Sequence, residues 1–429
     1  MSEKRTFNNR KLHPSSVPCP PTSVLRALSS AFLLACLMFL AGCPAKNPEP
    51  VHPQPAESPI LKRIPADRLP DLQDDEQYGK LRSAIMTSLA WYGRISDNKP
   101  LPLGNHTISA SVLQDSMKLF LDLLDSGHID TQTLSQEFDV FQVVPPDRGG
   151  RMLVTGYYEP VLEGSLKPGG RFRWPLYGIP ADLVTIDLDR FDPARFHGER
   201  LVGRLEKNRI VPFYTRSEIE GQKKLDRSGV ELLWLKDPVD CFFLHIQGSG
   251  MIKLPDGRSL RVGYAGSNGR PYSSIGRTLI EKGVVSREEM SMKAISIYLH
   301  AHPEHREEIM WENESYVFFR FVPEGPLGSL NSVLTDGRSV ACDPKFHPRG
   351  ALAFLVSEKP MYDSSGQIAG WAWLGRWVLN QDTGGAIKGL GRIDLFCGTG
   401  DTAEKMAGPM KQPGDLYYFI KKGLSPQDW

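Results

Sequence analysis

The chain has 429 residues, of which 24% are charged and 40% hydrophobic. This length suits two or three globular domains, and the composition is too polar for a polytopic membrane protein. The 51 basic and 50 acidic side chains nearly cancel, which disfavours a nucleic-acid-binding protein, because such proteins typically carry an excess of basic residues. Glycine contributes 40 residues and proline 34 without a repeating period, which favours turns and short strands over a helical bundle.

The first 43 residues have the pattern of an export signal. A basic segment precedes the apolar run Leu28–Leu40, which is too short to span a bilayer comfortably. The run ends in Leu40-Ala41-Gly42-Cys43, which resembles the lipobox of bacterial lipoproteins and implies that Cys43 becomes the lipidated first residue. An ordinary signal peptide or a signal anchor is the alternative. Pro44 stands where an inner-membrane retention signal would have Asp, so the resemblance implies the periplasmic side of the outer membrane.

Residues 44–60 hold six prolines and are expected to form an extended tether between the membrane and the folded part. Three further cysteines follow, Cys241, Cys342 and Cys397. They are far apart and form no CxxC motif, so we expect no metal site. Two of them can form one disulfide in an oxidising compartment. The preferred interpretation is that all three are buried free thiols.

The folded part begins with helices and continues mainly as strands. Apolar residues at helical spacing predict helices around residues 81–92 and 113–124, the second starting at a Ser111/Gln114 capping box. From residue 150 onwards short apolar runs predict strands, among them 152–160, 240–250 and 258–266. A helical region at 275–299, with a Ser286/Glu289 capping box before its second half, interrupts them.

Strands are then predicted from residue 315 to the end, with a short helix at Asp401–Ala407. No period of 20–50 residues repeats, which excludes solenoids and propellers. Short strands without long helices between them cannot form a doubly wound sheet. The pattern therefore predicts a mainly β fold with some α, containing at least one β-barrel.

Most of the chemical motifs are weak. His300, His302 and His305 are closely spaced, but they stand where a predicted helix meets Pro303, so a solvated helix end is the preferred interpretation. Gly248-Ser249-Gly250 lacks the GxSxG pattern of a serine hydrolase. Gly398-Thr399-Gly400 lacks the third glycine of a phosphate-binding loop.

The segment from Gln381 to Gly414 carries a stronger signal. Asp382 is followed by Gly384, Gly385, Gly389 and Gly391 and then by Asp394, which lies inside an apolar strand. Clustered glycines permit positive φ and close approach of a polymer to the backbone. Asp394 points away from its apolar neighbours, and partial desolvation there would raise its pKa and suit it to general acid catalysis. A structural aspartate bonded to turn amides is the alternative.

This segment and five upstream blocks resemble the membrane-bound lytic murein transglycosylase A family. The blocks are GYYEP (156–160), IQGSG (246–250), YAGSNGRPYSSIG (264–276), NESYVFF (313–319) and GRSVACD (337–343). The similarity spans roughly residues 150–420. The family's three-aspartate positions fall on Asp343, Asp382 and Asp394, and its catalytic acid corresponds to Asp394. Cys397 departs from the larger side chain usual in the family.

The resemblance implies a double-psi β-barrel domain interrupted by an inserted second β-rich domain. The barrel would comprise residues 61–155 and 323–429, and the insert residues 156–322. The glycan would lie where the two domains meet. Asp382 and Asp343 would support the site or contact sugar, and Gln247 and Lys388 are plausible sugar contacts.

The expected activity is cleavage of the β-1,4 bond between N-acetylmuramic acid and N-acetylglucosamine with formation of a 1,6-anhydro ring, Asp394 acting as both acid and base. One carboxylate suffices because the attacking C6 hydroxyl belongs to the substrate. A hydrolase using Asp382 and Asp394 and a non-catalytic wall-binding lipoprotein are the alternatives. No cofactor, metal or nucleic acid is expected. The expected partners are peptidoglycan glycan strands and, through Cys43, the membrane. Cell-wall synthesis proteins are possible further partners, but the sequence does not identify which of them.

Overall fold

The computed structural model describes residues 60–196, 199–287 and 289–424. The predicted export signal, Cys43 and most of the predicted tether lie outside these residues. Within the described ranges, no helix combines the length and the apolar character needed to cross a bilayer.

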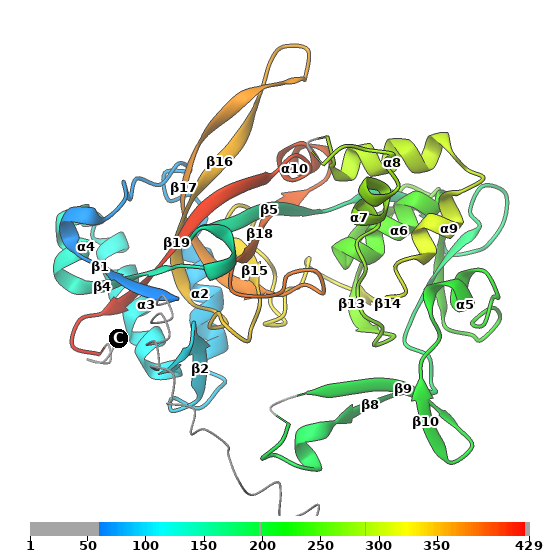
Figure 1. Cartoon of the computed structure of the whole chain (residues 1–429), viewed down its shortest axis with the longest axis horizontal. Helices are drawn as coiled ribbons and strands as arrows, with labels where there is room; N and C mark the ends of the chain where they lie inside the picture. The colour runs from blue at the N-terminus through cyan, green and yellow to red at the C-terminus, as the bar shows by residue number, and fades with distance from the viewer. Residues whose placement is uncertain (1–59, 197–198, 288, 425–429) are drawn as a thin grey trace, which may run out of the picture. The chain divides into compact units, whose positions relative to one another are not determined.

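The larger of the two main sheets closes on itself (Figure 1). Its eight strands follow the order β1-β4-β19-β16-β17-β15-β18-β5, and an additional pairing joins β19 to β5. The six strands from β19 to β5 in this order therefore form a closed barrel, which confirms the predicted fold class. The strands are β1 (Leu61–Ile64), β4 (Phe138–Val143), β5 (Met152–Glu159), β15 (Ser339–Cys342), β16 (Leu352–Tyr362), β17 (Ile368–Asp382), β18 (Arg392–Thr399) and β19 (Lys411–Lys421).

Helices and a small hairpin accompany the barrel. They are α2 (Leu81–Tyr92), α3 (Ala110–Asp125), α4 (Thr131–Glu137), α10 (Asp401–Ala407), the single turns η1 (Ala66–Arg68) and η2 (Pro146–Arg148), and the strands β2 (Pro100–Leu103) and β3 (His106–Ser109). The fully buried Trp377 of β17 packs on Phe120 of α3 and Phe419 of β19, with ring centroids 4.4 and 4.7 Å away. Helix α3 is thereby fixed to the barrel by apolar contact.

A buried ion pair attaches the segment before α2 to the barrel. Arg338 donates to both carboxylate oxygens of Asp74, at 2.6 and 2.8 Å, and both side chains are at most 1% exposed. Asp74 also accepts from the backbone N–H of Trp377 at 3.1 Å. The pair is satisfied by bidentate geometry, the arrangement that makes a buried charge tolerable.

The second main sheet lies in the predicted insert. Its order is β14-β13-β12-β6-β11-β7. These strands are β6 (Val161–Ser165), β7 (Trp174–Tyr177), β11 (Glu231–Leu235), β12 (Ser249–Lys253), β13 (Ser259–Ser267) and β14 (Val317–Val322). A separate three-stranded sheet contains β8 (Leu183–Asp187), β9 (Arg200–Glu206) and β10 (Arg209–Pro212). The helices here are η3 (Leu188–Arg190), α5 (Arg216–Glu220), α6 (Pro238–Gln247), α7 (Ile275–Glu281), α8 (Met292–Ala301) and α9 (Arg306–Trp311).

Three local predictions were wrong. Residues 240–250 were expected to be a strand, but Pro238–Gln247 form helix α6, because Asp237 caps its N-terminus by accepting from the N–H groups of Val239 and Asp240. The apolar residues of α6 are buried on several faces, so the run lacks helical periodicity. Helix α3 begins at Ala110 rather than at the Ser111/Gln114 box. The Ser286/Glu289 hydrogen bonds form, yet the helix begins at Met292, capped by Ser291.

The predicted domain division stays a prediction. Its first boundary, after residue 155, falls inside β5, and its second, after residue 322, coincides with the end of β14. The two parts are joined by a buried carboxylate. Glu159, 0% exposed, accepts from Thr399 Oγ1 at 2.7 Å and from Arg261 of β13 at 3.2 Å.

Candidate functional site

Asp394 and Asp382 lie on the same patch of barrel wall. Ala341 of β15 pairs with Asp394 of β18 on one side and with Asp382 of β17 on the other. Two strand spacings therefore separate the aspartate backbones, about 10 Å. Opposed residues of neighbouring strands point to the same face of a sheet, so both carboxylates belong to one surface.

Asp394 is partly exposed and held by one neighbour. Its Oδ1 accepts from Thr155 Oγ1 at 2.5 Å, and Thr155 is its register partner on β5. Among the described residues, no protein donor reaches Oδ2. Burial raises the pKa of Asp394, against the Thr155 hydrogen bond and the charge of Arg392, which lower it. The carboxyl group is thus shifted towards its protonated form while one oxygen faces no protein donor.

Asp382 is held at both oxygens. Its Oδ2 accepts from the Tyr157 hydroxyl at 2.8 Å and its Oδ1 from the backbone N–H of Ser329 at 3.0 Å. Burial raises the pKa of Asp382 to about 6, with a further contribution from the negative charge of Asp394, while its hydrogen bonds oppose the shift. Because both oxygens already accept hydrogen bonds, Asp382 is better suited to positioning other groups than to acting as a general base.

Tyr157 connects the two aspartates through β5. Its ring packs on Phe396 of β18 with centroids 5.3 Å apart. Burial and the neighbouring Asp382 raise the pKa of Tyr157, so its hydroxyl remains a hydrogen-bond donor. Sequence reasoning assigned no role to Thr155, Tyr157 or Ser329. The available signal was the alternation of Thr155 with Tyr157 of the GYYEP block, which places both side chains on one strand face.

Asp343 differs from the other two aspartates. It is 4% exposed, and its two carboxylate oxygens accept from the backbone N–H groups of Lys345 (3.1 Å) and Gly389 (2.7 Å). It therefore ties the turn after β15 to the glycine-rich loop. That loop needs positive φ only at Gly389, where φ is +84°. At Gly391 a side chain would meet Pro145 at 2.9 Å, so close packing explains that glycine.

The two predicted sugar contacts lie in different settings. Lys388 is exposed in the glycine-rich loop. Gln247 ends α6, where its Oε1 accepts from the backbone N–H of Tyr158 at 3.1 Å and its Nε2 donates to Met292 Sδ at 3.4 Å. Gln247 thus joins the insert to β5 directly beside Tyr157. The sugar-binding role of both residues stays a prediction.

The other sequence candidates take structural positions. His300 lies in the last turn of α8, with its Nε2 3.3 Å from Asp237 Oδ1. In the described part of the chain no group of His, Cys, Asp and Glu is arranged to hold a metal ion. Cys241, Cys342 and Cys397 are free thiols, and the first two are buried.

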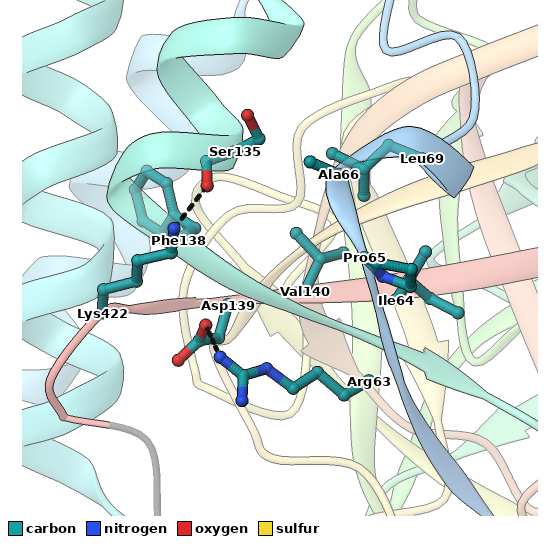
Figure 2. A pocket seen from close by; sticks show the side chains of 10 residues that line it. All are labelled: Arg63, Ile64, Pro65, Ala66, Leu69, Ser135, Phe138, Asp139, Val140 and Lys422. Atoms are coloured by element: carbon teal, nitrogen blue, oxygen red, sulfur yellow. Dashed lines mark hydrogen bonds and ion pairs between the residues drawn. The ribbon is translucent and has the colours of Figure 1, made fainter.

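A depression of about 320 Å³ lies away from the aspartates (Figure 2). It is lined by Arg63, Ile64, Pro65, Ala66, Leu69, Ser135, Phe138, Asp139, Val140 and Lys422. Its two cations are engaged, Arg63 with Asp139 at 2.5 Å and Lys422 with the carbonyl of Ser135 at 2.7 Å. None of the predicted site residues lines it.

Comparison with known proteins extends these observations. Residues 153–320 match the family described as the MltA specific insert domain, and residues 338–420 match the 3D domain. The chain is 34% identical over 299 residues to the membrane-bound lytic murein transglycosylase A of Vibrio cholerae, covering 69% of this chain and 72% of that protein.

Solved structures agree with the sequence matches. A membrane-bound lytic murein transglycosylase from Agrobacterium tumefaciens has a TM-score of 0.69 and 31% identity, over 84% of this chain and 98% of that one. Escherichia coli MltA with bound chitohexaose has a TM-score of 0.63 and 26% identity, over 85% of this chain and 95% of that one.

Proposed function

The chain belongs to the membrane-bound lytic murein transglycosylase A family and is an enzyme that cleaves peptidoglycan, and on this premise we propose that Asp394 carries out the cleavage as the single general acid and base. The observation that carries the proposal is the state of its carboxyl group: one oxygen is held by Thr155, no donor in the described residues holds the other, and burial favours the protonated form.

The reaction proceeds in two proton transfers. The Asp394 carboxylic acid protonates the glycosidic oxygen between N-acetylmuramic acid and N-acetylglucosamine while the bond from that oxygen to C1 breaks. The resulting carboxylate accepts the proton of the C6 hydroxyl, whose oxygen bonds to C1 and closes the 1,6-anhydro ring. Asp394 ends protonated again, and no water is consumed. The intramolecular nucleophile has a large effective concentration.

Asp382 acts here as a positioning residue. Its engagement by Tyr157 and Ser329 supports this role over that of a second catalytic carboxylate, which a hydrolase requires. Asp343 shapes the glycine-rich loop that carries Lys388, and Gln247 and Lys388 contact sugar. The chitohexaose bound by the E. coli relative supports a glycan as the ligand.

The enzyme is anchored by lipid at Cys43 on the periplasmic side of the outer membrane. The tetrad Leu40-Ala41-Gly42-Cys43 and the absence of Asp at position 44 support this location. The relatives' description as membrane-bound is consistent with it.

The test is Asp394→Asn, which keeps the size of the side chain but removes its proton cycle. We expect the cleavage rate to fall at least ~10²-fold, the usual scale of general acid–base catalysis, while glycan binding is retained. The rate is measured by mass spectrometry of fragments released from purified sacculi. Activity within about threefold of wild type would assign the proton transfers to another carboxyl group.

A further inference from the structure

We propose that a second depression on the barrel, formed by Arg151, Ser357, Glu358, Trp373 and Pro413, binds a sugar unit of the glycan strand remote from the bond that is cleaved. The depression has a volume of about 200 Å³, and Val356 completes its lining. The inference rests on the proposed function in taking glycan as the substrate.

The depression shares a face of the barrel wall with Asp394. Thr155 is the register partner of Asp394, and Leu153, two residues earlier on β5, is the register partner of Pro413 on β19. Residues two apart on a strand point to the same face, about 7 Å from each other. A polymer lying over Asp394 and continuing along β5 towards its N-terminal end therefore reaches Pro413.

Trp373 supplies an aromatic platform. It is 41% exposed on β17, opposite Glu358 of β16. The indole ring lies over Gly375 of the same strand. A Cβ atom at Gly375 would lie 2.0 Å from the ring, so this position of the ring requires glycine there. The Gly375 carbonyl accepts from the Asp75 backbone N–H at 2.8 Å, which fixes the backbone beneath the ring.

The hairpin that carries this ring extends past the barrel. Strand β16 pairs with β19 only as far as Val356, whereas it pairs with β17 as far as Tyr362 (Figure 1). Trp373 thus stands where the hairpin leaves the barrel wall, beside Pro413, whose carbonyl accepts from Ser357 Oγ at 3.2 Å. The indole ring remains partly exposed at this point.

The polar groups around the ring favour a neutral, hydroxyl-rich ligand. Arg151 is paired with Asp415 at 3.0 Å, and Glu358 is exposed. One cation and two carboxylates leave no surplus positive charge for the carboxylates of a stem peptide. A pyranose instead offers an apolar C–H face to the indole and hydroxyls that donate to Glu358 and accept from Arg151.

The experiment measures binding of peptide-free glycan strands to the full chain carrying Asp394→Asn, so that the strands are not consumed. We expect Trp373→Ala to weaken the affinity for long strands about threefold to tenfold, the scale of one lost aromatic contact. This loss of affinity should be larger than the loss measured with a disaccharide, which cannot span both the depression and the cleavage site at Asp394. Trp373→Phe should recover part of the affinity, because it restores a smaller ring.

Phe191→Ala is the matched control, since it removes an exposed aromatic ring, 77% exposed, from the insert. It should leave the affinity unchanged. Equal affinities of Trp373→Ala and Phe191→Ala for the peptide-free strands would overturn the sugar subsite. The identity of the wild-type product decides the proposed function separately, so failure of either proposal is recognised independently.

Discussion

At the scale of single residues, the chemistry depends on the environment given to otherwise similar aspartates. Asp343 is buried and bonded to two backbone amides, Asp382 is held at both oxygens, and Asp394 is held at one. Three carboxyl groups in one barrel thus have different capacities to exchange a proton with a ligand. Burial raises the pKa of both Asp394 and Asp382, which favours a protonated carboxyl at the start of the reaction.

The pH dependence should follow the Thr155–Asp394 hydrogen bond. Asp394 must begin protonated, so activity should peak on the acid side of neutral and fall as pH rises through its raised pKa. The Thr155 hydroxyl stabilises the carboxylate and lowers this pKa. Thr155→Val should therefore move the alkaline limb of the kcat/KM profile upward, by about one pH unit. Thr87→Val, on an exposed face of α2, should leave the profile in place, and a downward shift in Thr155→Val would contradict the assignment.

The sequence identified Asp394 as the strongest candidate by pattern and resemblance, but it could not supply its neighbours. Thr155 precedes Asp394 by 239 residues, and only the parallel pairing of β5 with β18 brings them together. The two oxygens of Asp382 are bonded by Tyr157 and Ser329, which lie in two other segments. Hydrogen-bond partners of this kind depend on tertiary register, which local periodicity does not encode.

At the scale of elements, local signals predicted secondary structure where one face of an element is solvated. Helix α2 was predicted at its observed residues from the helical spacing of its apolar side chains. Helix α10 was predicted at its observed residues from the glycine that precedes it. Helix α6 was misread because burial on several faces removes the periodicity, although Asp237 and Pro238 were available as start signals. The type of barrel was predicted only from the family resemblance, because its parallel strand pairs join separate segments of the chain.

The buried Arg338–Asp74 pair should dominate the attachment of the segment before α2. Asp74→Ala leaves the Arg338 guanidinium buried and without its carboxylate, so we expect a loss of about 3–5 kcal/mol in the free energy of unfolding. Urea denaturation provides the measurement. Asp125→Ala is the matched control, because it breaks the exposed pair with Arg82 and should cost less than about 1 kcal/mol. Equal losses in the two variants would show that burial of the pair contributes nothing.

At the scale of the whole molecule, the barrel and the insert are coupled where the substrate is expected. Glu159 joins β5 to Thr399 of β18 and to Arg261 of β13, and Gln247 joins α6 to Tyr158. Both connections lie within four residues of Thr155. Strand β5 therefore carries the hydrogen-bond donors for two aspartates and the first contacts of the insert.

The membrane attachment is tested at Cys43, which follows the predicted export signal. Cys43→Ser should yield a soluble or uncleaved form without acyl chains, because it removes the sulfur proposed to carry the lipid. Metabolic labelling with a fatty acid, followed by fractionation of the envelope, provides the measurement. Incorporation of label at the wild-type level in Cys43→Ser would contradict the anchor.

The central claim is that the substrate's own hydroxyl, and not water, attacks C1. Digestion of sacculi in H₂¹⁸O followed by mass spectrometry tests it most directly. We predict muramic acid ends at the anhydro mass without heavy oxygen, and Asp382→Asn should slow this reaction without changing its product. If Asp382 and Asp394 acted as a hydrolytic pair, each cleavage would add one water. Heavy oxygen at C1 in most of the wild-type product would contradict the account.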